Sequence, residues 1–290
     1  MVIDIMRVIK RKIGRNSYNY LQHSFRDKGR VKTAEIYLGK AIPEDIDIIK
    51  KEFSDRIIKE TLSESLDVVR VGFKKEWLHY PESVREKIKE QLAEVFTYNT
   101  NAIEGSTITL EETREIIEHN IAPNKPLRDI KETEAHAAEF LRMLEKKEKP
   151  DISLILRWHN RLFGDTKKDI AGMFREHLIR VGDYVAPDWQ DVKKLMGNLI
   201  DFYNQNKRKM GAVELAARMH YKFEKIHPFG DGNGRVGRLM MNYILWHDGY
   251  PMLIIEYKKR KAYYHALKKD EDYFFHYFVR RFLRAHKKYL

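Results

Sequence analysis

Cysteine is absent from this sequence of 290 residues. Its absence excludes disulfide bonds, zinc–thiolate sites and a thiol nucleophile. Long apolar runs are also missing: none approaches the ~20 residues of a membrane span, and none near the start is typical of a secretory signal. These absences predict a soluble, cytoplasmic protein that has no membrane partner.

Acidic residues are outnumbered by basic ones. The 55 lysines and arginines exceed the 43 aspartates and glutamates, which gives a formal net charge of +12. Such a charge favours acidic partners, namely nucleotides, nucleic acids or acidic protein surfaces. A generally lysine-rich surface explains it equally well, so the charge alone selects no function. The length is sufficient for a sizeable core in one or two domains.

The stretch of residues 227–238, HPFGDGNGRVGR, is predicted to form a glycine-rich loop between two buried helices. Apolar residues recur at helical spacing before it, and Pro228 is predicted to end that first helix at His227. The second helix is apolar almost all round, which indicates a core helix. The glycines allow a left-handed turn that brings backbone N–H groups close to a ligand, and a helix N-terminus is an anion site.

The side chains of this loop suit a nucleotide di- or triphosphate. Arg235 and Arg238 are three residues apart, so one helix face can present both to neighbouring phosphates. Asp231 supplies a hard oxygen ligand that suits Mg²⁺ better than zinc. The imidazole of His227, with an ordinary pKa near ~6.5, can take a proton from a hydroxyl at neutral pH. Together these residues indicate phosphoryl or nucleotidyl transfer.

The same stretch resembles the HxFx(D/E)GNGRxxR motif of Fic-domain proteins and matches it at every fixed position. The similarity continues through residues 239–242, 249–251 and 263–267. It extends from about residue 90 to residue 285 and leaves the N-terminal third unexplained. The resemblance implies a mainly α fold with a Fic helical core and a β-hairpin flap.

The reaction that the resemblance implies is transfer of AMP from ATP and Mg²⁺ to a Ser, Thr or Tyr hydroxyl of a protein. By resemblance, His227 takes the proton of that hydroxyl, and Asp231 holds Mg²⁺ across the α- and β-phosphates. Arg235 and Arg238 neutralise the β- and γ-phosphates. The α-phosphate is cradled by backbone N–H groups and one amide side chain, those of Gly232, Asn233 and Gly234 and the Asn233 side chain. The chain is thus expected to be a protein adenylyltransferase with ATP as co-substrate.

Residues 177–185 are predicted to form the flap of this fold. By resemblance, Val181 and Gly182 lie against the nucleotide, while the flap edge pairs with the backbone of the target segment. Tyr263 and Tyr264 have two interpretations, helix packing or a stacking platform for a base. The resemblance favours Tyr264 as the platform.

A predicted helix that starts at Pro81 ends in the sequence TNAIEG, residues 100–105. Gly105 is placed as the glycine that follows a helix C-terminus. The sequence matches the [S/T]xxxE[G/N] inhibitory motif found beside many Fic domains. The resemblance implies that Glu104 pairs with Arg238 and holds the enzyme in a low-activity state. Without the family, Glu104 would be interpreted as a solvated carboxylate at the negative end of the helix dipole.

The first 42 residues are predicted to form a basic β-hairpin segment. Two β-rich runs, at 18–21 and 31–38, flank a turn at 26–30 in which Gly29 is placed for positive φ. Up to residue 40 there are ten lysines and arginines against three acidic residues. The charge allows a nucleic-acid contact here, with nothing beyond charge to support it.

The remainder of the chain divides into a helical linker region, residues 43–89, and a Fic domain with its inhibitory helix, residues 90–290. Within these regions the patterns predict a helix over 43–70, a break at 80–81, a capping box at 109–112 that opens a short helix, and a β-like segment at 253–255.

Three alternatives to this function remain open. A Fic-like kinase would transfer the γ-phosphate, but such relatives carry lysine where this chain has Gly234. Another donor, such as UTP or CDP-choline, or the removal of AMP, would use the same site. From a different class, the loop would sense ATP in a basic nucleic-acid-binding regulator. The sequence also allows a homodimer, and Glu271 stands where some relatives carry an asparagine near the nucleotide.

Overall fold

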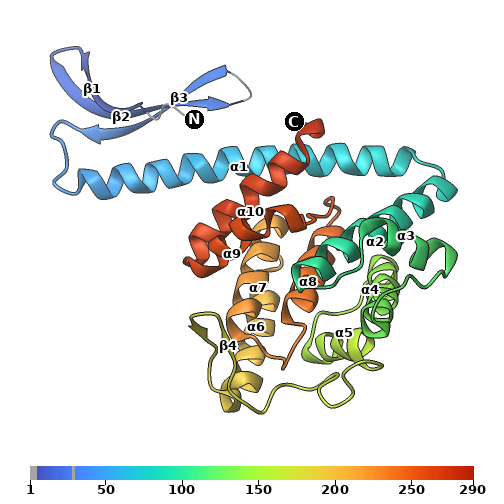
Figure 1. Cartoon of the computed structure of the whole chain (residues 1–290). Coiled ribbons are helices and arrows are strands. Elements are labelled where there is room, and N and C mark those ends of the chain that lie inside the picture. The colour runs from blue at the N-terminus through green and yellow to red at the C-terminus, as the bar shows by residue number, and fades with distance from the viewer. Residues whose placement is uncertain (1–4, 28–29) are drawn as a thin grey trace. The chain divides into compact units, whose positions relative to one another are not determined.

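The computed structural model describes residues 5–27 and 30–290. It divides into two compact units, one of residues 1–69 with 288–290 and one of residues 70–287. The structure is mainly helical, with a small antiparallel sheet near the N-terminus and a two-stranded flap, so the predicted fold class is confirmed (Figure 1).

The first unit contains a three-stranded antiparallel sheet in the order β1-β2-β3. Its strands are β1 (Ile5–Ile13), β2 (Asn16–Asp27) and β3 (Arg30–Gly39). The predicted hairpin corresponds to β2 and β3, and the predicted turn at Gly29 lies outside the described residues. Sequence reasoning missed β1, because its lysines and arginines obscure the alternation that β2 and β3 display.

The core of this unit forms between one face of the sheet and helix α1 (Ile46–His79). Leu21 of β2 pairs with Val8 and Ile36 on the neighbouring strands, and it packs against Phe53 and Ile57 of the helix. The sequence predicted a helix that ends near residue 70. The observed helix continues through Gly72 to His79, immediately before the predicted break.

Besides residues 70–79 of α1, the second unit contains nine further α-helices and the flap within the described chain (Figure 1). The helices are α2 (Glu82–Ile103), α3 (Leu110–His119), α4 (Leu127–Glu145), α5 (Ile152–Phe163), α6 (Val192–Asn206), α7 (Ala212–Ile226), α8 (Asn233–His247), α9 (Arg260–Lys268) and α10 (Glu271–Ala285). The flap strands are β4 (Arg180–Val181) and β5 (Tyr184–Val185), and short 3₁₀ turns cover Trp189–Asp191 and Tyr257–Lys259.

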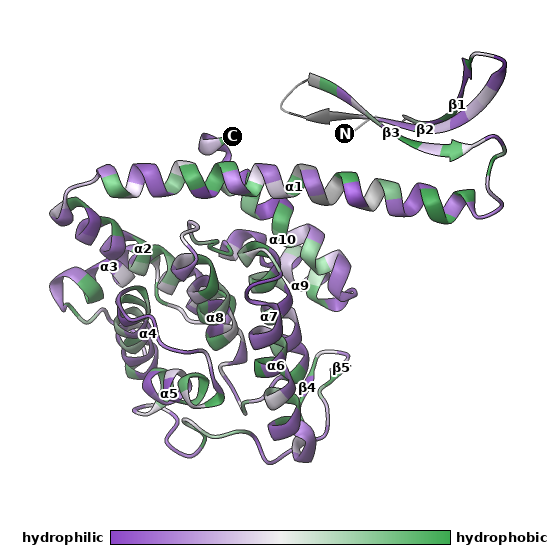
Figure 2. Cartoon of the chain, turned by 180° about the vertical axis from the view of Figure 1, so that it is seen from behind, coloured by the Kyte–Doolittle hydropathy of each residue, from purple (hydrophilic) through white to green (hydrophobic). Residues whose placement is uncertain are grey.

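Helix α8 is the core helix of the second unit, as its sequence predicted. Every residue from Asn233 to Leu245 is buried. The helix contacts α2, α4, α5 and α7, which surround it in Figure 1, and apolar positions, in green, recur along its ribbon in Figure 2. Because α8 begins at the end of the glycine-rich loop, the surrounding helices fix the position of that loop.

Local signals in the sequence account for other element ends. The predicted capping box is present, since Thr109 accepts from the Glu112 backbone and Glu112 accepts from the Thr109 backbone. Helix α3 then ends at Asn120 in a left-handed conformation. The prediction of a β-like segment at 253–255 is wrong. The Leu253 N–H donates to the Asn242 side-chain oxygen and the Leu253 carbonyl accepts from the Asn242 side-chain nitrogen, so this backbone does not pair with a strand.

Nowhere in the described residues does a helix combine the length and the apolar character that a membrane span requires.

Candidate functional site

The predicted site loop joins α7 to α8, and His227 lies at its start. His227 ends α7 in a left-handed conformation with φ 51°, which few non-glycine residues adopt. Its backbone N–H still donates to the Phe223 carbonyl at 2.9 Å, and its carbonyl accepts from Arg175 Nε at 2.8 Å. Arg175 also donates to His177 and Pro187 carbonyls, so a buried guanidinium holds the strained turn in place.

Asn233 fixes the opposite end of the loop. Its side-chain oxygen accepts from the Phe229 backbone N–H, and its amide nitrogen donates to the Phe229 carbonyl, both at 2.8 Å. The resemblance assigned this side chain to the α-phosphate; in this structure it makes both of these hydrogen bonds within the loop. The first backbone N–H groups of a helix have no partner within it, so the start of α8 can offer N–H groups to an anion.

His159 of α5 contacts two residues of the same loop. Its ring stacks on Phe229 with centroids 3.8 Å apart, and its Nε2 lies 3.0 Å from the Asp231 carbonyl. Burial lowers the pKa of His159 to about 4, so the ring is neutral at physiological pH. Sequence reasoning missed this residue, because a single histidine on an apolar helix carries no distinguishing pattern.

Two glycines of the loop are required by close approach. Gly232 has φ 79°, and a Cβ there would lie 2.3 Å from a ring carbon of Phe163. A Cβ on Gly234 would lie 2.2 Å from Glu104 Oε1 and 2.7 Å from Arg238 Nη1. Gly234 therefore leaves the space in which Glu104 and Arg238 meet.

Arg238 is buried, with 1% of its surface exposed. Its Nη2 donates to Glu104 Oε1 at 2.6 Å and to the Thr100 carbonyl at 3.1 Å, while its Nε donates to the Thr100 hydroxyl. Burial acts to lower the pKa of Arg238, but the nearby Glu104 carboxylate holds that pKa above its ordinary value. The contact that the inhibitory motif implies is thus present in the structure.

Arg235 points to a different partner. Its Nη1 forms an ion pair with Glu132 of α4, and its guanidinium lies 4.3 Å from the ring centre of Phe163. The sequence predicted that Arg235 and Arg238 grip neighbouring phosphates, whereas in this structure each guanidinium is paired with a carboxylate. Glu132 lies 103 residues from Arg235 in the chain, and no sequence signal links the two.

Asp231 has the half-exposed carboxylate of the site. Its Oδ1 accepts from the Gly232 backbone N–H at 2.6 Å, and its Oδ2 lies 2.7 Å from Lys167 Nζ. Burial acts to raise the pKa of Asp231, but Lys167 and Arg235 hold that pKa below its ordinary value. The carboxylate is therefore ionised at neutral pH.

Asp231 fits a magnesium ion that a nucleotide brings with it. Mg²⁺ in nucleotide sites commonly takes one or two carboxylates together with phosphate oxygens and water. Among the described residues no group of three or more histidines, aspartates or glutamates could hold a metal by itself. A metal here would depend on Asp231 and on the phosphates of a ligand, and the lysine ammonium beside Oδ2 shows that a positive charge is stable at this oxygen.

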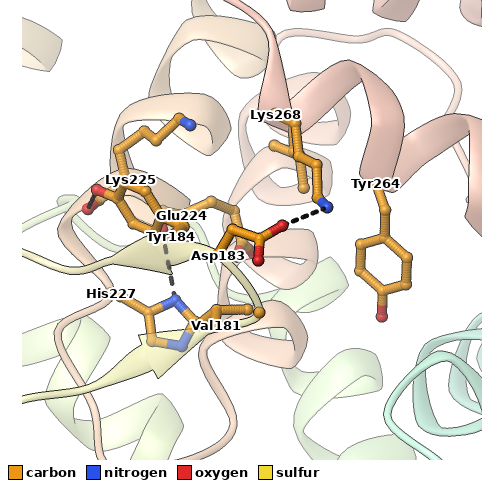
Figure 3. Close-up of a pocket in the computed structure, with 10 residues that line it drawn as sticks. Val181, Asp183, Tyr184, Glu224, Lys225, His227, Tyr264 and Lys268 are labelled. Carbon is orange, nitrogen blue, oxygen red and sulfur yellow. Dashed lines mark hydrogen bonds and ion pairs between the residues drawn. The ribbon is translucent and has the colours of Figure 1, made fainter.

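A cavity of about 590 Å³ opens beside His227 (Figure 3), a volume in the range typical of small-molecule sites. It is lined by the flap, the end of α7 and α9, through Val181, Gly182, Asp183, Tyr184, Glu224, Lys225, His227, Tyr264, Leu267 and Lys268. The flap is anchored to α7 by the Tyr184 hydroxyl, which donates to the Lys225 carbonyl at 2.5 Å. The cavity therefore lies between the predicted flap and His227, the predicted catalytic base.

His227 Nδ1 lies 3.4 Å from the Glu224 carbonyl, and a dashed line marks this contact in Figure 3. A proton on Nδ1 satisfies this contact and leaves Nε2 as a proton acceptor. Burial lowers the pKa of His227, although the Glu224 carbonyl and the Glu104 carboxylate oppose this effect. The imidazole is therefore in its basic, neutral form at pH 7.

The two tyrosines of α9 lie in different environments. Tyr263 is buried, and its hydroxyl lies 2.7 Å from His220 Nε2 in the core. Tyr264 is 40% exposed, lines the cavity and donates to the Ile103 carbonyl at 3.1 Å. Of the two tyrosines, Tyr264 is the one that the base of a bound nucleotide could contact.

Comparison with known protein families matches residues 149–245 to the Fic/DOC family. The chain is 38% identical over 176 residues to the protein adenylyltransferase Fic of Nematostella vectensis, covering 59% of this chain and 41% of that protein. It is 34% identical over 225 residues to the protein adenylyltransferase Fic of Drosophila willistoni, covering 73% and 44%. The chain therefore spans less than half the length of these curated relatives.

Solved structures agree in fold. A fragment of Fic-1 from C. elegans superposes with a TM-score of 0.69 at 28% identity, covering 84% of this chain and 75% of that one. A Fic domain containing signaling protein from Bacteroides thetaiotaomicron superposes with a TM-score of 0.68 at 23% identity, covering 76% and 93%. With the motif, the loop geometry and the family match in agreement, the chain is a Fic-domain protein.

Proposed function

We propose that this protein is a protein adenylyltransferase, which transfers AMP from ATP to a Ser, Thr or Tyr hydroxyl of a protein. The observation that carries the proposal is the meeting of a neutral, partly buried imidazole, a helix N-terminus and a nucleotide-sized cavity at one loop, with His227 at its edge. The curated relatives bear the same activity in their names.

In the proposed reaction, His227 Nε2 takes the proton of the target hydroxyl. The hydroxyl oxygen then forms a bond to the α-phosphorus of ATP, and the bond from that phosphorus to the bridging oxygen of the β-phosphate breaks. Pyrophosphate leaves with the electron pair, and AMP remains on the target. The left-handed backbone of His227, held by Arg175, fixes the direction from which the base approaches.

The start of α8 would stabilise the charge that builds on the α-phosphate. The first N–H groups of a helix have no partner within the helix, and its N-terminus is positive. Asn233 contributes indirectly, because its amide holds the loop at Phe229 and keeps these N–H groups in position. Arg235 and Arg238 would neutralise the β- and γ-phosphates once they no longer pair with Glu132 and Glu104.

Asp231 is the residue that would hold Mg²⁺. When bound, the ion would neutralise and orient the α- and β-phosphates. The ionised, half-exposed state of the Asp231 carboxylate supports this assignment.

The nucleotide base would lie in the cavity, between the flap residues Val181 and Gly182 and the ring of Tyr264. The target segment would pair with the exposed edge of the flap within residues 177–185, so that its hydroxyl reaches His227. Hydrogen bonds to a strand edge are made by backbone, which makes this mode of recognition tolerant of target sequence.

Glu104 would restrain the enzyme by holding Arg238. The guanidinium already donates to Glu104 and to Thr100, so it cannot offer the same nitrogen atoms to a γ-phosphate. A lysine at position 234, as in the kinase alternative, would collide with this pair, which favours the transferase.

The proposed function is tested with ATP labelled on either the α- or the γ-phosphorus. Wild-type protein should become labelled by α-³²P-ATP and not by γ-³²P-ATP, and the label should be lost in His227→Ala. His119→Ala, which removes an exposed histidine at the end of α3, is the matched control and should retain it. Label from the γ-position alone would indicate a kinase, and full labelling of His227→Ala would overturn the assignment of the base.

A further inference from the structure

Lys167 forms a bridge between two carboxylates at the edge of the site loop. Its Nζ lies 2.7 Å from Asp231 Oδ2 and 3.0 Å from Glu132 Oε1. The ammonium also lies 4.6 Å from the ring centre of Phe163, and only 15% of the side chain is exposed. A lysine this well enclosed has a defined position and is not a mobile surface charge.

The bridge occupies the oxygen atom that a metal would need. Asp231 Oδ1 accepts from the Gly232 backbone N–H, so Oδ2 is the oxygen of this carboxylate that remains for an external cation. In this structure that oxygen is bound by the Lys167 ammonium. A divalent cation and an ammonium cannot both contact one oxygen without strong repulsion.

Glu132 gives the ammonium an alternative position. Its Oε2 forms the ion pair with Arg235, while its Oε1 accepts from the Thr166 hydroxyl at 3.1 Å and lies 3.0 Å from Lys167 Nζ. The Lys167 ammonium can therefore leave Asp231 and remain paired with Glu132. Burial acts to raise the pKa of Glu132, but Arg235 and Lys167 hold that pKa below its ordinary value, so the carboxylate stays charged.

We propose that Lys167 is a positioning residue that occupies the metal-binding oxygen of Asp231 until a nucleotide-bound divalent cation displaces it onto Glu132. Lys167 thereby sets the concentration of divalent cation that the protein requires. The inference depends on the proposed function at one point only, the role of Asp231 as the metal ligand.

The test measures metal binding directly. Free Mn²⁺ is followed by electron paramagnetic resonance while Mn²⁺ is titrated into the protein saturated with a non-hydrolysable ATP analogue. Lys167→Met keeps the apolar stem and removes the charge, so its Mn²⁺ affinity should rise by about fivefold or more. Lys168→Met is the matched control, because it removes the same charge from an exposed neighbouring side chain and should bind Mn²⁺ as the wild type does.

A double-variant comparison shows whether the effect passes through Asp231. In an Asp231→Asn background, Lys167→Met should change Mn²⁺ affinity little, because the contested oxygen is no longer charged. Lys167→Gln provides a second test, and thermal melting verifies that each variant is folded. Unchanged or weaker Mn²⁺ binding in both Lys167 variants would overturn the inference. Since binding is measured without turnover, an absence of AMP transfer would refute the proposed function and leave this result standing.

Discussion

His227 combines a strained backbone with a partly buried imidazole, and the proposed mechanism uses both features. The left-handed conformation at φ 51° turns its side chain out of the direction of α7 and toward the cavity. Arg175 holds this turn through the His227 carbonyl. Burial makes the protonated ring unfavourable, which keeps the base ready at neutral pH.

The partial burial of His227 predicts that AMP transfer declines on the acid side only at a low pH. Since the pKa of His227 is lowered, the neutral base persists to a pH below the ordinary value of ~6.5. Transfer should therefore decline only below that pH, as the imidazole becomes protonated. The measurement is kcat/KM for AMP transfer between pH 5 and pH 8. A decline with its midpoint above ~6.5 would contradict the assignment.

Glu224 is a second partly buried ionisable residue beside the site. Its Oε1 has no hydrogen-bond partner among the described residues, and it lines the cavity one turn before His227. Burial raises the pKa of Glu224 from its ordinary value of 4.5 to about 7, with Arg238 opposing this rise and Glu104 adding to it. The carboxylate is thus costly to ionise in the folded protein.

This shift predicts that Glu224 makes the fold less stable as the pH rises. The folded protein keeps the proton up to about pH 7, while the unfolded chain releases it near 4.5, so stability falls between these values. The contribution is ~3 kcal/mol, at 1.36 kcal/mol for each pKa unit. Glu224→Gln should lose this part of the pH dependence. Urea unfolding at pH 5 and pH 8 measures it, and equal differences in the wild type and Glu224→Gln would refute it.

The sequence identified the residues of the motif but not all of the residues that form ion pairs with them. His227, Asp231 and the two arginines could be identified because they lie within twelve consecutive positions. Lys167 and Glu132 could not, because their contacts depend on α4 and on the segment that follows α5 lying against the start of α8. Long-range ion pairs have no local pattern, so only the fold reveals them.

At the scale of elements, the C-terminus of α2 decides the state of Arg238. Thr100 and Glu104 lie one helical turn apart, and both accept hydrogen bonds from the Arg238 guanidinium. Glu104 follows the last residue of α2, where a negative charge opposes the helix dipole. The partner cation offsets that cost, so the position of Glu104 depends on Arg238.

Removal of the Glu104 carboxylate is predicted to activate transfer. In Glu104→Gly, Arg238 keeps its Thr100 contacts and becomes available to the γ-phosphate, which aligns the α-phosphorus with the incoming oxygen. A coupling of ~1–3 kcal/mol gives roughly 5–150-fold higher labelling. The measurement is auto-modification by labelled ATP at equal protein concentration, with Glu104→Gly, His227→Ala as the blank. Equal labelling of wild type and Glu104→Gly would leave Glu104 as an ordinary solvated carboxylate.

Elements with a strong local signal were predicted well. The 3.6-residue period identified α7 and α8, and the capping box at Thr109 identified the start of α3. The exceptions have local causes. Gly72 is tolerated inside α1, and the apolar run at 253–255 is held by the Asn242 side chain instead of a neighbouring strand. At 253 a side chain from α8 takes the place of a neighbouring strand, which the local sequence pattern cannot represent.

At the scale of the whole molecule, every residue assigned to the site lies in the second unit, residues 70–287. Glu104 and Thr100 belong to this unit although they lie outside the Fic/DOC match at 149–245. The restraint on Arg238 is therefore built from a helix that precedes the matched family region. The first unit has a core of its own, and a nucleic-acid role for its basic sheet stays a prediction.

The separate cores predict that the first unit can be destabilised without loss of transfer. Leu21 is fully buried and contacts Phe53 and Ile57, the only other buried hydrophobic residues of its cluster among those described. Leu21→Ala should lower the stability of the sheet by about 2–5 kcal/mol, which so small a core cannot compensate. AMP transfer should stay near the wild-type rate, because no residue assigned to the reaction lies in this core.

Ile13→Ala is the matched control for this prediction, because Ile13 lies in the same sheet with 56% of its surface exposed and should change stability little. Limited proteolysis should cleave Leu21→Ala within the first 69 residues much faster than either the wild type or Ile13→Ala. Labelling by α-³²P-ATP before proteolysis measures transfer in the same samples. Loss of transfer in Leu21→Ala, with transfer retained in Ile13→Ala, would mean that the reaction needs an intact N-terminal sheet, through its target or through the inhibitory helix.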